Sequence, residues 1–170
     1  MKPKLKIAIV GLGRIGWGFH FMQSHRSAEF ELVAAVDPLP ERLAEARDLA
    51  GCRTYTRYGD MWKRESPDVV AIASPTRLHE RSSRRALREG AHVILEKPMT
   101  TTVASADRII EEAERQDRRV FVYQPHRLTP ETRTAREIIQ SGVLGPIYLI
   151  RRSAGRYVRR SDWQSLRKHG

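Results

Sequence analysis

Residues 4–16 read Lys-Leu-Lys-Ile-Ala-Ile-Val-Gly-Leu-Gly-Arg-Ile-Gly, and this stretch decides the expected fold. The aliphatic run before the first glycine is typical of a strand buried on both faces of a sheet. The spacing GxGxxG that follows predicts a tight turn at which a helix begins, with backbone N–H groups that favour an anion. The first glycine allows the bend, the second lets a ligand approach the backbone, and the third lets helix and strand pack closely. The residues expected to bind a phosphate group here are Gly11, Gly13, Arg14, Ile15 and Gly16.

A second aliphatic run, Phe30 to Val36, ends at Asp37, roughly 20 residues after the last glycine of the turn. A carboxylate at this position accepts hydrogen bonds from an adenosine ribose. It would repel a 2′-phosphate, so the sequence predicts NAD in preference to NADP, although Arg42 is a nearby arginine of the kind that accommodates that phosphate. The alternative is a glycine turn without a ligand, followed by an aspartate that only caps a helix.

Strands and helices alternate along the rest of the chain. Further strands are expected over 53–56, 68–73, 91–95 and 119–123, and helices over 17–24, 40–46, 77–88, 102–116 and 130–141. This alternation predicts an α/β fold, a doubly wound parallel-sheet Rossmann domain. A domain boundary is expected near Gly145. It would separate a dinucleotide-binding domain, residues 1–144, from the truncated start of a second α/β domain, residues 145–170, with a strand over 147–152 and a basic tail.

The composition is that of a globular protein rather than a disordered one, with 170 residues of which 40% are hydrophobic. Cys52 is the only cysteine, so the chain can form no internal disulfide and no cysteine-built metal cluster. We therefore expect a cytoplasmic protein without a bound metal. No apolar run reaches the ~20 residues of a membrane-spanning helix, so no membrane association is expected.

The formal charge is +11, from 31 Lys and Arg against 20 Asp and Glu. More than half of the excess lies in residues 151–170, a segment suited to nucleic acid, to an acidic substrate or simply to solvent. Helical spacing also places four arginines on one face of the helix expected over 77–88, namely Arg77, Arg81, Arg84 and Arg88. For both features we favour a solvated surface over a nucleic-acid site.

Five motifs occur in the order and spacing of one family of enzymes. They are Gly11 to Gly16, Val36-Asp37-Pro38, Ser74-Pro75-Thr76-Arg77-Leu78-His79, Glu96-Lys97-Pro98 and His126-Arg127-Leu128-Thr129-Pro130. In these motifs, which span essentially the whole chain, the sequence resembles the Gfo/Idh/MocA oxidoreductases, the family of glucose-fructose oxidoreductase and inositol dehydrogenase. The Glu-Lys-Pro motif is the most specific of the five.

The resemblance implies a Rossmann domain that binds NAD(H) or NADP(H), followed by an α/β domain whose open sheet supports oligomerisation. It implies hydride transfer between nicotinamide C4 and a carbinol carbon of a sugar, cyclitol or related polyol. Lys97 would be the catalytic residue that hydrogen-bonds the reacting hydroxyl, at a strand end where α/β sheets bind ligands. The alternative for Lys97 is a surface lysine paired with Glu96. Further residues that the resemblance places beside the cofactor or substrate are Ser74, Pro75, His79, Glu96, His126 and Arg127.

The chain departs from the family beyond Asp162-Trp163-Gln164. Similar proteins continue into a glycine-rich stretch and an aspartate-x-glycine-x-histidine motif, which supplies a second catalytic residue, whereas this sequence stops at Gly170. We therefore expect a cofactor-binding portion with little turnover alone, and a strand over 147–158 without its sheet. The full-length form is expected to be a homo-oligomer that acts on a small polyol or sugar. A non-catalytic dinucleotide-binding or redox-sensing module is the alternative function.

Overall fold

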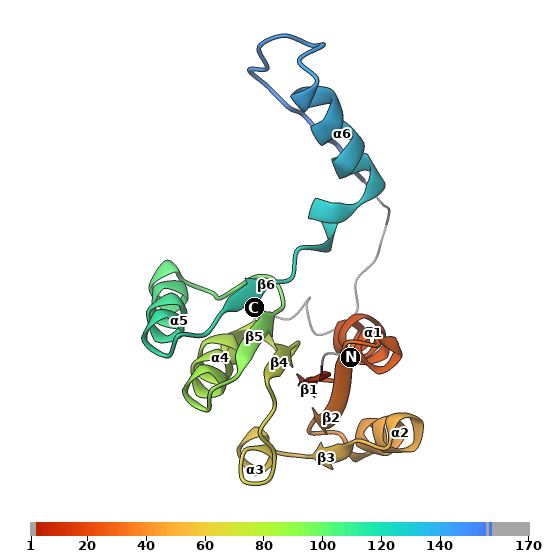
Figure 1. The fold of residues 1–170 in the computed structure, drawn as a ribbon, viewed down its shortest axis with the longest axis vertical. Coiled ribbons are helices and arrows are strands. Elements are labelled where there is room, and N and C mark those ends of the chain that lie inside the picture. Colours follow the sequence, from red (N-terminus) through yellow and green to blue (C-terminus); the bar gives the residue numbers. More distant parts are fainter. Residues whose placement is uncertain (1–2, 156, 158–170) are drawn as a thin grey trace. The chain divides into compact units, whose positions relative to one another are not determined.

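The first part of the chain folds around a six-stranded parallel sheet (Figure 1). The computed structural model describes residues 3–155 and residue 157. Its strands are β1 (Leu5–Val10), β2 (Phe30–Val36), β3 (Arg53–Tyr55), β4 (Val69–Ile72), β5 (His92–Leu95) and β6 (Val120–Val122). Each strand lies within about one residue of the range expected from its aliphatic run, a closer agreement than element boundaries usually allow.

The strands are ordered β3-β2-β1-β4-β5-β6, and every neighbouring pair is parallel. From β1 the sheet continues on one side to β2 and β3 and on the other side to β4, β5 and β6, so the strand order reverses between β1 and β4. In open α/β sheets, ligands bind in the crevice outside the carboxyl ends of the strands at such a reversal. The expected doubly wound Rossmann fold is confirmed, and the crevice lies beside the glycine turn that follows β1.

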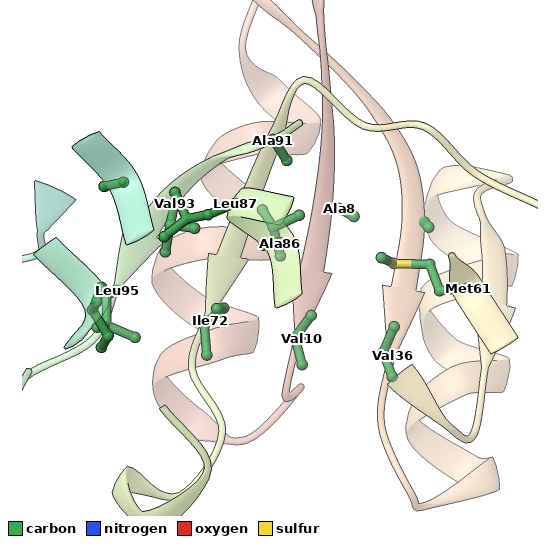
Figure 2. Close-up of a cluster of buried hydrophobic side chains, with 14 residues drawn as sticks. Ala8, Val10, Val36, Met61, Ile72, Ala86, Leu87, Ala91, Val93 and Leu95 are labelled. Carbon is green, nitrogen blue, oxygen red and sulfur yellow. The ribbon is translucent and has the colours of Figure 1, made fainter. Parts of the chain in front are cut away.

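Helices cover both faces of the sheet (Figure 1). They are η1 (Gly16–Phe21, a π-helix), α1 (Met22–Arg26), α2 (Pro40–Ala50), α3 (Tyr58–Met61), η2 (Thr76–Leu78, a 3₁₀ helix), α4 (His79–Arg88) and α5 (Val103–Arg115). Ala8 and Val10 of β1 belong to a buried cluster with side chains of α3, α4 and α5 (Figure 2). Ile7 and Ile9 belong to a second cluster with side chains of η1 and α2. Burial on both faces explains why the central parts of β1 and β4 are continuously aliphatic.

The helix after the glycine turn differs from the α-helix expected over 17–24. Residues 14–15 are α-helical, η1 is a π-helix, and α1 returns to α geometry. A π turn closes its hydrogen bonds over one more residue than an α turn does. Here the π-helix carries two inward side chains in succession, His20 and Phe21, and Phe21 stacks on Trp17 with ring centroids 4.6 Å apart.

Arginines of α4 and α5 are held in ion pairs around two glutamates. Glu112 of α5 is 2% exposed, and its carboxylate binds the guanidinium groups of Arg88, at 2.8 Å, and Arg115. Glu80 of α4 accepts two hydrogen bonds from Arg108 of α5, at 2.6 and 2.9 Å. This arrangement gives arginines on both helices a structural role, because their charges join α4 to α5.

The environment of Glu112 predicts that stability depends on acid pH. Burial raises the pKa of this carboxyl, but hydrogen bonds from two arginines and a glutamine outweigh burial and lower the pKa from 4.5 to about 2. A lowered pKa stabilises the folded state above pH 4.5, and this contribution is lost as the pH falls toward 2. We expect Glu112→Gln to lower the free energy of unfolding at pH 7 by roughly 2–3 kcal/mol, measured by urea unfolding.

Glu111→Gln is the matched control, because Glu111 is the exposed neighbour of Glu112 on the same helix. It should change the unfolding free energy by less than about 0.5 kcal/mol. The loss of stability between pH 4.5 and 2 should be shallower in Glu112→Gln than in the wild type. An equally steep pH dependence in both proteins would contradict the role given to Glu112.

The second compact unit begins at Gln124, earlier than the domain boundary expected near Gly145. It contains η3 (Pro125–Leu128) and α6 (Pro130–Gln140), neither of which has a buried residue. The first unit ends at Tyr123 because β6 completes the sheet there, and α6 is therefore not part of the Rossmann unit. That residues 145–170 begin a second α/β domain stays a prediction.

The strand expected from Ile147 is not formed in the described residues, where 145–155 belong to no helix or strand. A strand needs a neighbour for its backbone hydrogen bonds, and the described part of the second unit includes no other strand. Apolar side chains of residues 144–150 instead line a hollow of about 480 Å³ with those of α6. Most of the basic tail and the Trp163 segment lie outside the described residues. Across the described part of the chain, no helix has the length and apolar character needed to cross a membrane.

Candidate functional site

The expected site residues follow four strands whose carboxyl ends lie at one edge of the sheet. The glycine turn follows β1, Asp37 follows β2, Ser74 follows β4, and Glu96 and Lys97 follow β5. Backbone hydrogen bonds of 2.8 to 3.0 Å join the residues directly after β1, β4 and β5 to a neighbouring strand. The parallel sheet therefore brings these segments together at the reversal between β1 and β4.

The glycine turn has a tight bend, a close packing contact and an open position. Gly11 has a φ of 91°, and a Cβ there would lie 2.8 Å from the carbonyl group of Ala73. A Cβ on Gly16 would lie 1.8 Å from the Gly11 oxygen, because the helix begins directly against the end of β1. At Gly13 the nearest neighbour of a Cβ would be the Arg42 side chain, at 3.8 Å. The turn therefore has room beside its backbone for a phosphate group.

Asp37 is buried beside this turn and binds its backbone. Oδ2 accepts a hydrogen bond from the Leu12 N–H at 2.7 Å, and Oδ1 accepts one from the Leu39 N–H at 3.0 Å. The Arg42 guanidinium lies 3.7 Å from Oδ2. Each carboxylate oxygen has a second lone pair to share. The Asp37 carboxylate therefore stabilises the turn and can still accept a hydrogen bond from a ribose hydroxyl.

The loop after β4 carries a buried hydroxyl group that suits a ligand. Ser74 Oγ has no hydrogen-bond partner in the part of the chain that the structure describes. Ser74 and Pro75 are half-buried, as is Ile15 on the glycine turn, whereas Arg14 is exposed. A buried hydroxyl without a partner is unfavourable, so a bound ligand that hydrogen-bonds Ser74 would remove that cost.

His79 has a different place from the one expected at the cofactor. It is 1% exposed, and both ring nitrogens face backbone carbonyls, with Nε2 2.8 Å from the Ser74 oxygen and Nδ1 3.0 Å from the Pro98 oxygen. These two carbonyls belong to the loops after β4 and β5. The ring therefore connects the loops after β4 and β5, and both ring nitrogens are engaged by their carbonyls.

Glu96 and Lys97 are neighbours with opposite environments. Glu96 is 7% exposed, whereas Lys97 is exposed. Oε1 of Glu96 lies 2.8 Å from Nε2 of the buried His20, and Oε2 accepts a hydrogen bond from the Lys97 backbone N–H at 3.2 Å. The side-chain partner of Glu96 is thus His20 rather than the Lys97 ammonium. Glu96 is engaged inside the domain instead of facing a cofactor as expected.

His20 is a buried neighbour of Glu96 that the sequence analysis did not single out. The available signal was a histidine in the helix that starts at the glycine turn. The ordinary 3.6-residue period does not reveal the π turn that carries it.

His126 and Arg127 lie in η3 of the second unit. The Thr132 hydroxyl donates to the His126 carbonyl at 2.7 Å, so this turn is closed by contacts within that unit. The place of both residues beside the cofactor or substrate stays a prediction.

The crevice fits a dinucleotide in three respects. It offers open backbone at Gly13, a carboxylate acceptor at Asp37 and a buried hydroxyl without a partner among the described residues at Ser74. Lys97 adds an exposed ammonium at the same sheet edge. Such a set can bind a diphosphate and a ribose and can stabilise negative charge on a substrate oxygen.

Comparison with known proteins agrees with this chemistry. Residues 5–124 match an oxidoreductase family with an NAD-binding Rossmann fold, Gfo/Idh/MocA. Inositol 2-dehydrogenase of Corynebacterium glutamicum is 29% identical over 153 residues, covering 89% of this chain and 45% of that protein. D-glucoside 3-dehydrogenase of Escherichia coli is 34% identical over 155 residues, covering 85% of this chain and 42% of that protein. The chain thus spans less than half the length of these relatives.

A solved structure extends the likeness to three dimensions. Scyllo-inositol dehydrogenase of Lactobacillus casei, with bound NAD(H) and scyllo-inositol, superposes with a TM-score of 0.79 at 26% identity, covering 84% of this chain and 43% of that one. The sequence match, the fold and the arrangement of the strand ends therefore all indicate the same family. The chain belongs to the Gfo/Idh/MocA family of oxidoreductases, and residues 5–124 are its NAD-binding Rossmann domain.

Proposed function

We propose that this chain is the cofactor-binding portion of an oxidoreductase that moves hydride between NAD(H) and a carbinol carbon of a polyol. The observation that carries the proposal is the glycine turn, open at Gly13 and crowded at Gly11 and Gly16, with the Asp37 carboxylate beside it. The open position supports a diphosphate on the backbone amides, and the carboxylate supports an adenosine ribose. Because a carboxylate repels a 2′-phosphate, NAD is favoured over NADP.

Lys97 is the proposed catalytic residue. The nicotinamide, when bound, supplies the hydride donor or acceptor. The Lys97 ammonium lies exposed after β5, where it would donate a hydrogen bond to the reacting hydroxyl and stabilise the negative charge that develops on that oxygen. Its neighbour Glu96 is held by His20 and so does not neutralise this charge.

The names of the relatives guide the proposed substrate. The two curated relatives are named for inositol and a D-glucoside, and the solved structure holds scyllo-inositol. We propose a cyclitol, sugar or related polyol as the substrate of the full-length protein. We further propose that this protein is a cytoplasmic homo-oligomer, with a second α/β domain that begins near residue 145 and with His126 and Arg127 beside the cofactor or substrate.

Titration with NADH, followed by fluorescence, tests the cofactor site that the proposed enzyme shares with a non-catalytic dinucleotide-binding or redox-sensing module, and turnover with polyols separates the two. We expect saturable binding at or below about 1 mM NADH, and Lys97→Ala should leave the affinity unchanged because the turn and Asp37 remain. The same substitution should lower the residual rate of NAD-dependent polyol oxidation by at least about tenfold.

Three results would count against the proposed enzyme. A folded chain with no saturable signal at millimolar NADH removes both functions. Intact NADH binding with a polyol-dependent rate that Lys97→Ala does not change removes Lys97 as the catalytic residue, whereas intact NADH binding with no polyol-dependent rate favours the non-catalytic module.

A further inference from the structure

Two buried ionisable side chains from distant parts of the sequence are in contact inside the Rossmann unit. Nε2 of His20, in η1, lies 2.8 Å from Oε1 of Glu96, which follows β5. The side chains are 6% and 9% exposed. The pair has no part in binding the cofactor as proposed above, yet Glu96 is the immediate neighbour of Lys97.

Further contacts hold this pair in place. Oε2 of Glu96 accepts a hydrogen bond from the backbone N–H of Lys97 at 3.2 Å, and the backbone N–H of Glu96 donates to the Ile72 carbonyl at 3.0 Å. The Tyr123 ring packs edge-on against the His20 ring with centroids 4.9 Å apart. Burial raises the pKa of the Tyr123 hydroxyl, and the nearby Glu96 carboxylate raises it further. The carboxylate is therefore held inside the domain by the His20 ring and the Lys97 backbone N–H, and the His20 ring is itself packed against Tyr123.

Without His20, the Glu96 carboxylate would have to find another partner. A buried carboxylate that loses its side-chain donor and keeps only the Lys97 backbone N–H, at 3.2 Å, is unfavourable, so the side chain would turn outward to the surface. The adjacent cation in the chain is Lys97, and a carboxylate beside an ammonium takes up its N–H donors. Pairing of these two side chains would remove the ammonium from the reaction.

We propose that His20 is a positioning residue for Lys97, because by holding Glu96 inside the domain it leaves the Lys97 ammonium free to meet the substrate hydroxyl. This inference rests on the proposed function, in which Lys97 contacts the substrate. The π-helix supports it, since π turns are frequent at functional sites and this one carries His20 to Glu96.

Acetylation of the folded chain with trace acetic anhydride, read out by mass spectrometry, tests the proposal. The internal reference is Lys63, whose ammonium binds Asp60 at 2.7 Å. We expect His20→Leu, which removes the donor, to slow acetylation of Lys97 relative to Lys63 by roughly threefold to tenfold. His20→Gln keeps an N–H donor and should react like the wild type.

A double variant distinguishes capture of the Lys97 ammonium by Glu96 from a simple loss of packing at position 20. Adding Glu96→Gln to His20→Leu removes the charge that would capture the ammonium, so Lys97 should return to within about twofold of its wild-type reactivity. His92→Leu is the matched control, because it removes a histidine from β5, the strand that leads to Glu96, where the His92 Nδ1 accepts a hydrogen bond from the Arg119 N–H at 3.0 Å. It should leave Lys97 unchanged.

Equal reactivity of Lys97 in folded wild type and folded His20→Leu would overturn the proposal, and so would slow acetylation that persists in the double variant. If leucine prevents folding, His20→Asn, which is too short to reach Glu96, takes its place with the same expected result. NADH titration of the same proteins keeps the two proposals apart. A wild type that does not bind NADH contradicts the proposed function, whereas the acetylation rates decide the role of His20.

Discussion

Replacing Gly16 with alanine is expected to abolish saturable NADH binding and to destabilise the Rossmann unit. The new Cβ would lie 1.8 Å from the Gly11 carbonyl oxygen and 3.2 Å from the Ala73 side chain, so η1 would have to move away from the end of β1. Overpacking commonly costs about 1–3 kcal/mol, and we expect about 3 kcal/mol because the displaced atom is backbone. That corresponds to a fall in Tm of roughly 6–12 °C. The same movement displaces the amide groups on which binding depends.

Gly18→Ala is the matched control. Gly18 lies exposed in the same π-helix, and, apart from its chain neighbours and the backbone of its own helix, a Cβ there would have no atom within 4 Å among the described residues. Alanine at this position should leave binding unchanged and should stabilise the protein by up to about 1 kcal/mol. Thermal unfolding and NADH titration of both variants provide the comparison. Wild-type Tm and affinity in Gly16→Ala would show that helix and strand do not have the close contact described.

Asp37→Ser is expected to weaken NADH binding by roughly 10- to 100-fold and NADPH binding much less. The variant loses the ribose acceptor and the brace that Asp37 gives the turn through the Leu12 N–H. A hydrogen bond to a charged group contributes about 1.5–3 kcal/mol, and each 1.4 kcal/mol is a factor of about ten in affinity. Losing the brace lowers both affinities. Losing the negative charge favours NADPH and frees Arg42, 3.7 Å away, to bind a 2′-phosphate.

A second substitution separates these effects. Adding Arg42→Ala to Asp37→Ser should remove the relative advantage of NADPH, because the cation that would bind its phosphate is gone. Fluorescence titrations of wild type, Asp37→Ser and the double variant with both cofactors measure the six affinities. Equal losses for NADH and NADPH in Asp37→Ser would mean that Asp37 only braces the turn and does not contact the ribose.

Most of the strands could be predicted because they are aliphatic runs between polar or glycine-containing segments, whereas β3 has the sequence Arg-Thr-Tyr. The run Phe30–Val36 forms β2 with the expected bounds. In a parallel sheet covered on both faces, the central strands are largely buried, as is all of β4 and the second half of β1, so their aliphatic composition marks them. The strand expected from Ile147 is the counterexample. Its residues are equally apolar, but a strand forms only where a neighbour takes up its backbone hydrogen bonds, and the described part of the second unit includes no such neighbour.

The site was predictable in part for a similar reason. The carboxyl ends of parallel strands lie at one sheet edge, so Asp37 and Lys97 could be assigned to one crevice from their positions after aliphatic runs. The roles of His79 and Glu96 could not be assigned in this way. His79 faces carbonyls of two separate loops, and Glu96 pairs with a histidine 76 residues away in the sequence. Such partners are set by packing between elements, and no local pattern encodes them.

The amino-acid sequence by itself determined the alternation of strands and helices, the glycine turn and the acidic residue beside it, because each depends on local backbone preference and on strand polarity. The tertiary structure alone decided that His20 takes up Glu96, that His79 joins two loops, and that the Rossmann unit ends at Tyr123. The physical reason is that a buried polar side chain must find its partner wherever the packed fold places one, and the chain position of that partner is unrestricted.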